Sequence, residues 1–460
     1  MSLPFVDRSS SSLPVQFVMQ PKWRSWLKEQ NAARRGWLES LGIAGAAGDF
    51  AVLPGRDGKA AGAVLVLSAK PTLWDFGALT TKLPAGIWKL LDTGPVSPTD
   101  AAVAIGLGAW RFERYRARKA KPGARIVWPA GVDKARATAM IEAISMARDL
   151  ITTPSSDMGP AELAATAQAL AKQHKAKISV IVGDDLLKKN YPTIHAVGRA
   201  SARAPRLIDL IWGKPSDPKV TLVGKGVCFD TGGLDLKAAA GMLNMKKDMG
   251  GAATMMAVAA MVMACKLPVR LRLLVPAVEN SVSGNAFRPL DVITTRKGIT
   301  VEIGNTDAEG RLILCDALAE GASEKPSMMV DCATLTGAAR VSLGTDLPAL
   351  FCNDDELANG LLAAGTEVSD PMWRMPLYRP YRQLLASKVA DINNVSGGTF
   401  GGAITAALYL QEFVPDDVPW AHLDMMAWNN STRPGRPEGG EAQAARAIFA
   451  TIEKRIAGKG

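Results

Sequence analysis

Four carboxylates lie in two short stretches of the sequence, between residues 223 and 318, where they could act together. They are Asp230, Asp248, Asp307 and Glu309. If these side chains converge in a partly buried place, cations must neutralise them, because burying unpaired charge is costly. Two divalent metal ions would do so, and a two-metal centre can activate a water molecule and polarise a carbonyl group together. The carboxylates therefore favour metal-assisted chemistry.

Basic side chains occupy the same two stretches. The glycine-rich first stretch contains Lys225 and Lys237, but the G-x-x-x-x-G-K-[ST] spacing of a phosphate-binding loop is absent. In the second stretch, an extended backbone would place Asp307, Glu309 and Arg311 on one side, where the guanidinium could hold an anion. The apolar run that follows predicts a helix. As an equal alternative, the two acids could simply cap that helix.

Other common catalytic groups are scarce. The chain has three histidines and lacks a G-x-S-x-G motif, so a Ser-His-Asp triad is disfavoured. His422 lies in the apolar segment WAHLD and is expected to be a packed, hydrogen-bonded core residue. Five cysteines, an odd number without a C-x-x-C pair, indicate reduced thiols in a cytoplasmic protein.

No segment is expected to cross a membrane or to direct secretion. The longest apolar run, Met255 to Cys265, has 11 residues, well short of the ~20 that span a bilayer. The first residues lack a basic segment followed by an apolar one. We therefore expect a cytoplasmic location and no membrane partner.

The chain is basic, with 54 Lys plus Arg against 44 Asp plus Glu, a formal charge of +10 and a pI near 9.3. This balance favours loose contact with polyanions but does not show nucleic-acid binding. The densest basic stretch, Arg111 to Arg125, is interpreted as a solvated helix face that runs into a Pro-Gly turn. A phosphate-binding patch is the less favoured alternative, so nucleic acid is not expected as the main partner.

The length of 460 residues exceeds what one hydrophobic core usually supports. We therefore expect an α/β protein of two domains. The pattern places a small, variable N-terminal domain at residues 1–130, a linker helix at 131–154 and a larger domain at 155–460. In the larger domain strand-like runs alternate with helical ones, which predicts a central sheet flanked by helices.

Two motifs carry a close and specific resemblance. They read NTDAEGRL at residues 305–312 and VGKGVCFDTGGLDLK at residues 223–237. Together they resemble the signature of the leucyl aminopeptidase, or cytosol aminopeptidase, family. The resemblance continues through RDLITTPSSDMGP, KKDMGGAA, DCATLTGA, ADINNVSGGTFGGAITAALYL and WAHLDM, so it covers residues 148–430 and hardly touches residues 1–130. It implies a mixed sheet in the catalytic domain, peptide substrates cleaved at their N-terminus, and assembly as a homohexamer.

The family pattern implies a ligand set for two divalent metal ions. By the resemblance, Asp230 and Glu309 bridge the ions. Lys225 and Asp248 complete the tighter site, and Asp307 completes the more exchangeable one. The ions implied are Zn²⁺ or Mn²⁺, with Mg²⁺ as a further candidate. A lysine ligand must be neutral, so Lys225 would need a pKa far below its ordinary value of about 10.4.

The resemblance also implies a catalytic pair. Arg311 would hold a bicarbonate that relays the proton from the metal-activated water, and Lys237 would stabilise the oxyanion of the tetrahedral intermediate. The free α-amine of the substrate would bind one metal ion, which restricts cleavage to the N-terminal residue.

The first side-chain pocket of the family corresponds to four positions. They are Met245, Thr334, Gly337 and Met426. The family usually reads HLDIAG where this chain reads HLDMMA, so Met426 replaces a small residue and would shrink or reshape the pocket. A preference for leucine is therefore not implied.

Three rival functions remain. A nucleic-acid-binding module is the non-enzymatic one, because the chain is basic. A two-metal phosphatase would use the same carboxylates, but nothing in the sequence accounts for recognition of a phosphate ester. A catalytically inactive relative is disfavoured, because every ionic position of the motif is present.

Overall fold

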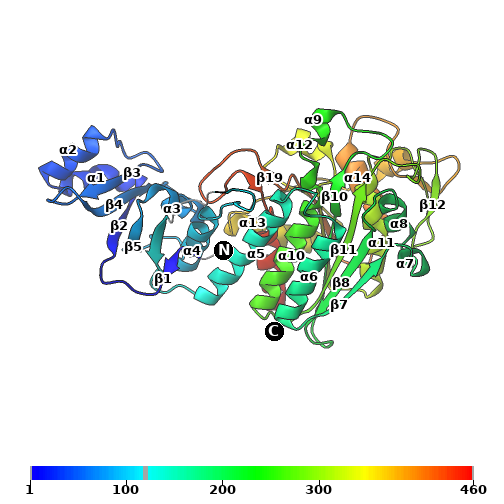
Figure 1. The fold of residues 1–460 in the computed structure, drawn as a ribbon, viewed down its shortest axis with the longest axis horizontal. Coiled ribbons are helices and arrows are strands. Elements are labelled where there is room, and N and C mark those ends of the chain that lie inside the picture. The colour runs from blue at the N-terminus through cyan, green and yellow to red at the C-terminus, as the bar shows by residue number, and fades with distance from the viewer. Residues whose placement is uncertain (1–2, 118–122, 458–460) are drawn as a thin grey trace. The chain divides into compact units, whose positions relative to one another are not determined.

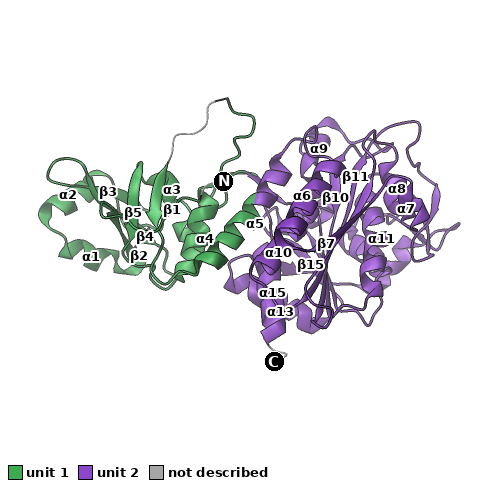
Figure 2. Cartoon of the chain, turned by 60° about the horizontal axis from the view of Figure 1, so that its bottom comes forward, with its two compact units in different colours: residues 1–145, 430–438 green, residues 146–429, 439–460 purple. Residues whose placement is uncertain are grey.

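The computed structural model describes residues 3–117 and 123–457, and the chain divides into two compact units (Figure 2). The first unit comprises residues 1–145 and 430–438, and the second comprises residues 146–429 and 439–460. The division falls inside helix α5 (Lys134–Thr152). The placement of residues 430–438 differs from the continuous domain over 155–460 expected from the sequence.

Residues 430–438 belong to the first unit because they pack tightly against it. A Cβ atom on Gly77 would lie 2.3 Å from the backbone nitrogen of Gly435, so the two backbones can approach this closely only at a glycine. The guanidinium carbon of Arg436 lies 4.8 Å from the ring centroid of Trp74. Both contacts join residues far apart in the sequence, which a local pattern does not reveal.

The first unit contains a six-stranded sheet (Figure 1). In spatial order its strands are β1 (Phe5–Val6), β6 (Ala124–Val127), β5 (Gly86–Leu90), β2 (Leu13–Met19), β4 (Ala60–Leu67) and β3 (Phe50–Pro54). All neighbours are parallel except β3 and β4. The helices are η1 (Gln20–Lys22), α1 (Trp23–Glu29), α2 (Ala32–Ser40), η2 (Leu73–Phe76), α3 (Leu79–Lys82) and α4 (Pro98–Gly108). This arrangement confirms a small α/β domain.

The basic stretch Arg111 to Arg125 does not form the expected solvated helix where the structure describes it. Residues 111–117 form turns and irregular backbone, because α4 has already ended at Gly108. The Nη1 group of Arg111 donates a hydrogen bond to the carbonyl oxygen of Gly108 at 3.2 Å, at the C-terminal end of α4. Residues 118–122 lie outside the described residues, and strand β6 follows. The helix prediction is therefore wrong for residues 111–117.

The second unit is built on a nine-stranded sheet. In spatial order eight strands are β16 (Trp373–Arg374), β15 (Ala349–Cys352), β18 (Trp420–Asp424), β14 (Met328–Ala333), β9 (Lys219–Gly224), β11 (Arg270–Asn280), β8 (Arg206–Trp212) and β7 (Lys177–Val182), and β10 (Gly226–Asp230) pairs with β11. The central strands from β18 to β11 are parallel, whereas β15, β8 and β7 pair in antiparallel fashion. The expected mixed sheet is therefore confirmed.

Helices cover both faces of this sheet (Figures 1 and 2). One face carries α6 (Pro160–His174), α10 (Gly250–Ala264), α13 (Asp355–Glu367) and α15 (Ala445–Ala457), and the other carries α8 (Pro192–Gly198), α11 (Glu309–Ser323) and α14 (Gly402–Gln411). Short helices are α7 (Asp185–Lys188), α9 (Ala239–Met242), η3 (Met245–Met249), α12 (Gly337–Leu343) and η4 (Arg379–Leu385). Small sheets join β12 (Val292–Thr294), β13 (Thr300–Glu302) and β17 (Ile392–Asn393), and β19 (Trp428–Asn429) and β20 (Gly439–Gly440). Within the described residues, no helix combines the length and apolar character needed to span a membrane.

Two glycines bring helix α10 close to the sheet. A Cβ atom on Gly251 would lie 2.0 Å from the carbonyl oxygen of Cys332 in β14, and one on Gly224 would lie 2.5 Å from the Cα atom of Ala252. Because α10 is apolar and buried around its circumference, it is a core helix. This close packing positions the segment just before α10, which contains Asp248.

His422 is a packed core residue, as the sequence predicts. It is fully buried on β18, and its Nδ1 atom lies 2.6 Å from Oδ1 of Asp331. Trp420 donates from Nε1 to the other oxygen of Asp331 at 2.7 Å. Burial alone would lower the pKa of His422, but the negative charge of Asp331 raises it above its ordinary value.

Asp316 on α11 makes the folding stability of the protein depend on pH. The side chain is fully buried and accepts hydrogen bonds from the backbone N–H groups of Thr193 and Arg296, at 2.9 and 2.8 Å. Burial raises the pKa of Asp316 from 3.8 to about 6, although these hydrogen bonds oppose the rise. A carboxyl group with a raised pKa contributes stability that is complete below its unfolded pKa. That contribution is lost as the pH rises through the folded pKa.

Asp316→Asn should therefore lose less stability than the wild type as the pH rises. The difference between the two proteins should be about 1 kcal/mol over the interval from about pH 5 to pH 7. Thermal unfolding midpoints of both proteins at both pH values measure this difference. At each pH the amide variant, which cannot titrate at this position, is the reference for the wild type. Identical pH dependence in both proteins would contradict this account of Asp316.

Candidate metal centre

The predicted site residues gather at the carboxyl ends of parallel strands in the second unit. Strand β9 ends at Gly224 and β10 ends at Asp230. Asp248 lies in η3, and Thr334 follows β14 directly. The loops at this edge of an α/β sheet are the usual place for binding and catalytic residues. The sheet thus brings together segments that are far apart in the sequence.

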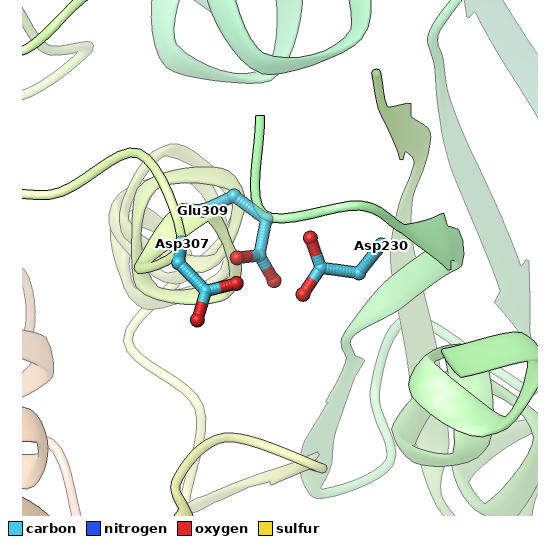
Figure 3. Close-up of side chains that lie close together, drawn as sticks. All are labelled: Asp230, Asp307 and Glu309. Carbon is cyan, nitrogen blue, oxygen red and sulfur yellow. The ribbon is translucent and has the colours of Figure 1, made fainter. Parts of the chain in front are cut away.

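Three carboxylates point toward one another, as Figure 3 shows. Asp230, Asp307 and Glu309 each offer one oxygen atom, and these three atoms all lie within 4.8 Å of one another. Asp230 and Glu309 are buried, whereas the Asp307 side chain is 34% exposed. Negative charges this close together and this little exposed are costly unless a cation neutralises them.

Lys225 connects the fourth acid to this cluster. Its Nζ atom lies 2.9 Å from Oδ2 of Asp248 and 2.9 Å from Oε1 of Glu309. A Cβ atom on Gly310 would lie 2.6 Å from the same Nζ, so glycine there leaves room for the amine. Burial alone would lower the pKa of Lys225, but Asp248 and Glu309 raise it above its ordinary value. The amine is therefore protonated in the protein alone, and it could bind a cation only if the cation displaced its proton.

Lys237 lies between the other two acids. Its Nζ atom lies 2.9 Å from Oδ2 of Asp230 and contacts Oδ1 of Asp307. Burial lowers and the two carboxylates raise the pKa of Lys237, and the net result is a pKa above its ordinary value. The residue is thus a fixed positive charge at the edge of the carboxylate cluster.

The donor set fits divalent cations. Burial, followed by the charge of Asp230, raises the pKa of Glu309 well above its ordinary value. Among the residues that the structure describes, Oε2 of Glu309 is buried without a hydrogen-bond partner. Burial also raises the pKa of Asp307. A cation would relieve these penalties. Carboxylate oxygens suit Mn²⁺ and Mg²⁺, and Zn²⁺ accepts both carboxylate oxygen and nitrogen ligands.

Asn280 and Thr334 orient the carboxylates. Asn280, at the end of β11, donates from Nδ2 to Oδ1 of Asp230 at 2.9 Å and to the carbonyl oxygen of Thr306 at 3.1 Å. Thr334 donates from its hydroxyl group to Oδ1 of Asp248 at 2.6 Å. Hydrogen bonds of this kind hold metal ligands in a fixed direction. Sequence reasoning missed Asn280, although its place at the end of a long apolar run is a usable signal.

Asn394 forms hydrogen bonds both with the loop before Asp307 and with Arg311. Its Oδ1 accepts from the N–H group of Gly304 at 2.8 Å, and its Nδ2 donates to the carbonyl oxygen of Asn305 at 2.8 Å. Its own carbonyl oxygen accepts from Nη1 of Arg311 at 2.5 Å. Asn394 is fully buried and lies in the motif ADINNVSGG, from which sequence reasoning assigned no role to it.

Arg311 lies in the first turn of α11 rather than in an extended segment. Helix α11 begins at Glu309, after a turn in which the N–H group of Asp307 donates to Oδ1 of Asn305 at 2.7 Å. Its N-cap residue is Ala308, and no side chain caps the helix. The extended interpretation and the capping alternative are therefore both wrong, because the turn starts the helix earlier than the apolar run suggests.

The guanidinium of Arg311 is buried and partly unpaired. Its carbon atom lies 6.0 Å from the ring centroid of Tyr409, and burial lowers the pKa of Arg311. Its Nε group has no hydrogen-bond acceptor within the described part of the chain. A buried guanidinium with a free N–H group fits a small anion such as bicarbonate.

The four predicted pocket residues lie in two groups. Thr334 contacts Asp248, as described above, and Met245 begins η3. Gly337 begins α12, and Met426 follows β18 with its Sδ atom 3.6 Å from Nη1 of Arg340. Arg340 is also in α12 and was not predicted from the sequence.

Two family models match almost the whole chain. Residues 145–449 match the catalytic domain of the cytosol aminopeptidase family, and residues 13–129 match the M17 aminopeptidase, N-terminal domain. The chain belongs to the cytosol aminopeptidase family. The second match extends this membership into the first 130 residues, where the sequence motifs show hardly any resemblance.

Solved structures and curated relatives agree with the cytosol aminopeptidase assignment. The crystal structure of cytosol aminopeptidase from Coxiella burnetii is 47% identical, with a TM-score of 0.94 over 98% of this chain and 99% of that one. The bottromycin maturation enzyme BotP, solved in complex with Mn, is 33% identical, with a TM-score of 0.86 over 97% of this chain and 100% of that one. A "Probable cytosol aminopeptidase" of Rhodococcus jostii is 41% identical over 77% of this chain and 74% of its own length. The protein is thus a peptidase of a metal-dependent aminopeptidase family with the two-domain architecture of that family.

Proposed function

We propose that this peptidase releases N-terminal amino acids from peptides with two metal ions and a bicarbonate as proton relay. The observation that carries the proposal is the convergence of Asp230, Asp307 and Glu309 within 4.8 Å, with Lys225 and Asp248 attached to the same cluster. Family membership supports the class of reaction. The geometry supports the use of metal, because four carboxylates gather around only two lysine charges, and the excess negative charge is costly to bury.

The ligand roles proposed are those of the family pattern. Asp230 and Glu309 would bridge the two ions, Lys225 and Asp248 would complete one site, and Asp307 would complete the other. Zn²⁺ and Mn²⁺ are the proposed ions, with Mg²⁺ as a third candidate, and the Mn in the BotP complex supports manganese. When bound, two such ions activate a water molecule and polarise the scissile carbonyl group.

Lys237 and Arg311 would act on the reacting groups. Lys237 would stabilise the oxyanion, since it is a positive charge beside Asp230 and Asp307 that remains charged at neutral pH. Arg311 would hold the bicarbonate through its unpaired N–H group and so place a proton acceptor near the attacking water.

The substrate and the assembly follow from the same proposal. The α-amine of the peptide would bind at the metal centre, and Met245, Thr334, Gly337 and Met426 would surround the first side chain. A cytoplasmic location is proposed, in line with the names of the curated relatives. A homohexamer is proposed from the family resemblance alone. Domain boundaries at residues 130 and 154 are proposed for the linker helix.

Removal and return of metal test the proposal. We expect a chelator to abolish hydrolysis of methionyl, leucyl, alanyl and glycyl anilides, and manganese or zinc to restore it, because the cluster otherwise lacks its Lewis acids. A generic phosphomonoester serves as the control substrate. Hydrolysis of the ester without hydrolysis of any anilide would contradict the proposal and favour a phosphatase.

A further inference from the structure

Arg340 places a positive charge between two residues of the proposed pocket. It lies one turn after Gly337 in α12, and its Nη2 atom would be 3.5 Å from a Cβ atom on that glycine. Its Nη1 atom lies 3.6 Å from Sδ of Met426. The guanidinium therefore lies against both Gly337 and Met426, and the side chain is partly exposed.

The charge of Arg340 has no acidic partner in the part of the chain that the structure describes. Within the described residues, no carboxylate oxygen lies within 4.0 Å of its guanidinium. Asp424, two residues before Met426, accepts from the N–H group of Leu335 at 3.0 Å, and from the N–H and hydroxyl groups of Thr336 at 3.1 and 2.6 Å. The carboxylate of Asp424 is therefore occupied by hydrogen bonds to the residues that precede α12.

We propose that Arg340 selects peptides whose N-terminal residue carries a side-chain carboxylate, glutamate or aspartate. The inference rests on the proposed function, which places Gly337 and Met426 around that side chain. A guanidinium offers several N–H groups, and a carboxylate can accept two of them in parallel. The thioether of Met426 occupies one edge of the guanidinium and leaves the others for the substrate. A pocket that presents unpaired donors rejects an apolar side chain, which would desolvate them without replacing the hydrogen bonds.

Four anilides distinguish this selectivity from a preference for apolar residues. They are the glutamyl, glutaminyl, leucyl and methionyl anilides, hydrolysed by the manganese-loaded enzyme. We expect the glutamyl kcat/KM to exceed the glutaminyl value by about tenfold or more, because hydrogen bonds to a charged group are about twice as strong as neutral ones. The ratio should fall as salt is added, since salt screens charge pairs. A higher kcat/KM for the leucyl or methionyl anilide than for the glutamyl anilide would overturn the inference.

Substitutions of Arg340 provide the decisive comparison. Arg340→Gln should bring the glutamyl to glutaminyl ratio close to one. Arg340→Glu should reverse the charge preference and favour a lysyl anilide over the glutamyl one, a gain that a misfolded variant does not show. Val341→Gln is the matched control, because Val341 is the next residue of α12 and 89% exposed, and it should keep the wild-type ratio.

Two outcomes separate the inference from the function on which it rests. Hydrolysis of the anilides with a glutamyl to glutaminyl ratio that Arg340→Gln leaves unchanged would overturn the role of Arg340 alone. Failure to hydrolyse any of the anilides with any metal would overturn the proposed function and this inference together.

Discussion

Glu309→Gln should remove at least one metal ion per chain and lower kcat/KM for an aminoacyl anilide by more than about 100-fold, the upper end of the cost of losing an outer-shell partner. Glu309 lies between the carboxylates of Asp230 and Asp307 and the amine of Lys225. It shares the oxygen triad with Asp230 and Asp307, and its Oε1 contacts Lys225. The amide keeps the shape of the side chain but brings no negative charge, so the cations would lose the bridging ligand proposed for them.

Metal analysis of the purified protein measures this effect directly. Glu324→Gln is a matched control, because Glu324 is the C-cap residue of the same helix, α11, and pairs with Arg270 at 2.9 Å. We expect the control to retain two ions and the wild-type rate. Full metal content in Glu309→Gln would show that the glutamate is not a ligand.

Arg311→Ala should lower kcat by about 100- to 1000-fold, the range found when one donor to a reacting oxygen is removed. The metal content should stay unchanged, because Arg311 contacts Asn394 and no carboxylate of the cluster in the part of the chain that the structure describes. Lys237→Ala should show a similar rate. It should also keep its metal, because removing this positive charge takes away a competitor of the ions for Asp230 and Asp307. The two variants differ in one respect, since only Arg311 is proposed to hold bicarbonate.

Bicarbonate dependence separates these two roles. Depleting bicarbonate should slow the wild type and Lys237→Ala by similar factors and leave Arg311→Ala unaffected. Arg382→Ala is the control, because Arg382 is an arginine of η4 that pairs with Glu412 at 2.6 Å. Equal sensitivity of Arg311→Ala and the wild type to bicarbonate would exclude the relay role of Arg311.

Unbroken apolar runs predict the buried parts of this fold well. The apolar runs that precede the site become β9, β10, β11, β14 and β18, and the run around Met255 becomes the fully buried helix α10. These segments are buried on all sides, so they are recognised as continuous apolar runs and not by alternation. The prediction that the sheet is mixed came from the family resemblance, because these runs do not show the direction of the strands.

Periodicity fails where polar contacts determine the backbone. The start of α11 depends on the turn at Asn305. Arg311 therefore lies in the first turn of the helix and not in the extended segment that was expected. The role of Arg340 depends on Met426, which is distant in the sequence. The four acids could be identified as a set from their spacing and charge, but their distances could not, because these depend on Asn280, Thr334 and the order of the strands.

The path of the chain through residues 430–438 affects how the protein can be dissected. A cut within α5 alone would leave this segment attached to the catalytic half, where Gly435 and Arg436 would lose Gly77 and Trp74 as packing partners. Because Asn429 and Gly439 are paired neighbours in the β19–β20 ladder, a tight two-residue turn could join them in place of the segment. An autonomous catalytic half therefore requires this hairpin closure as well as a new N-terminus.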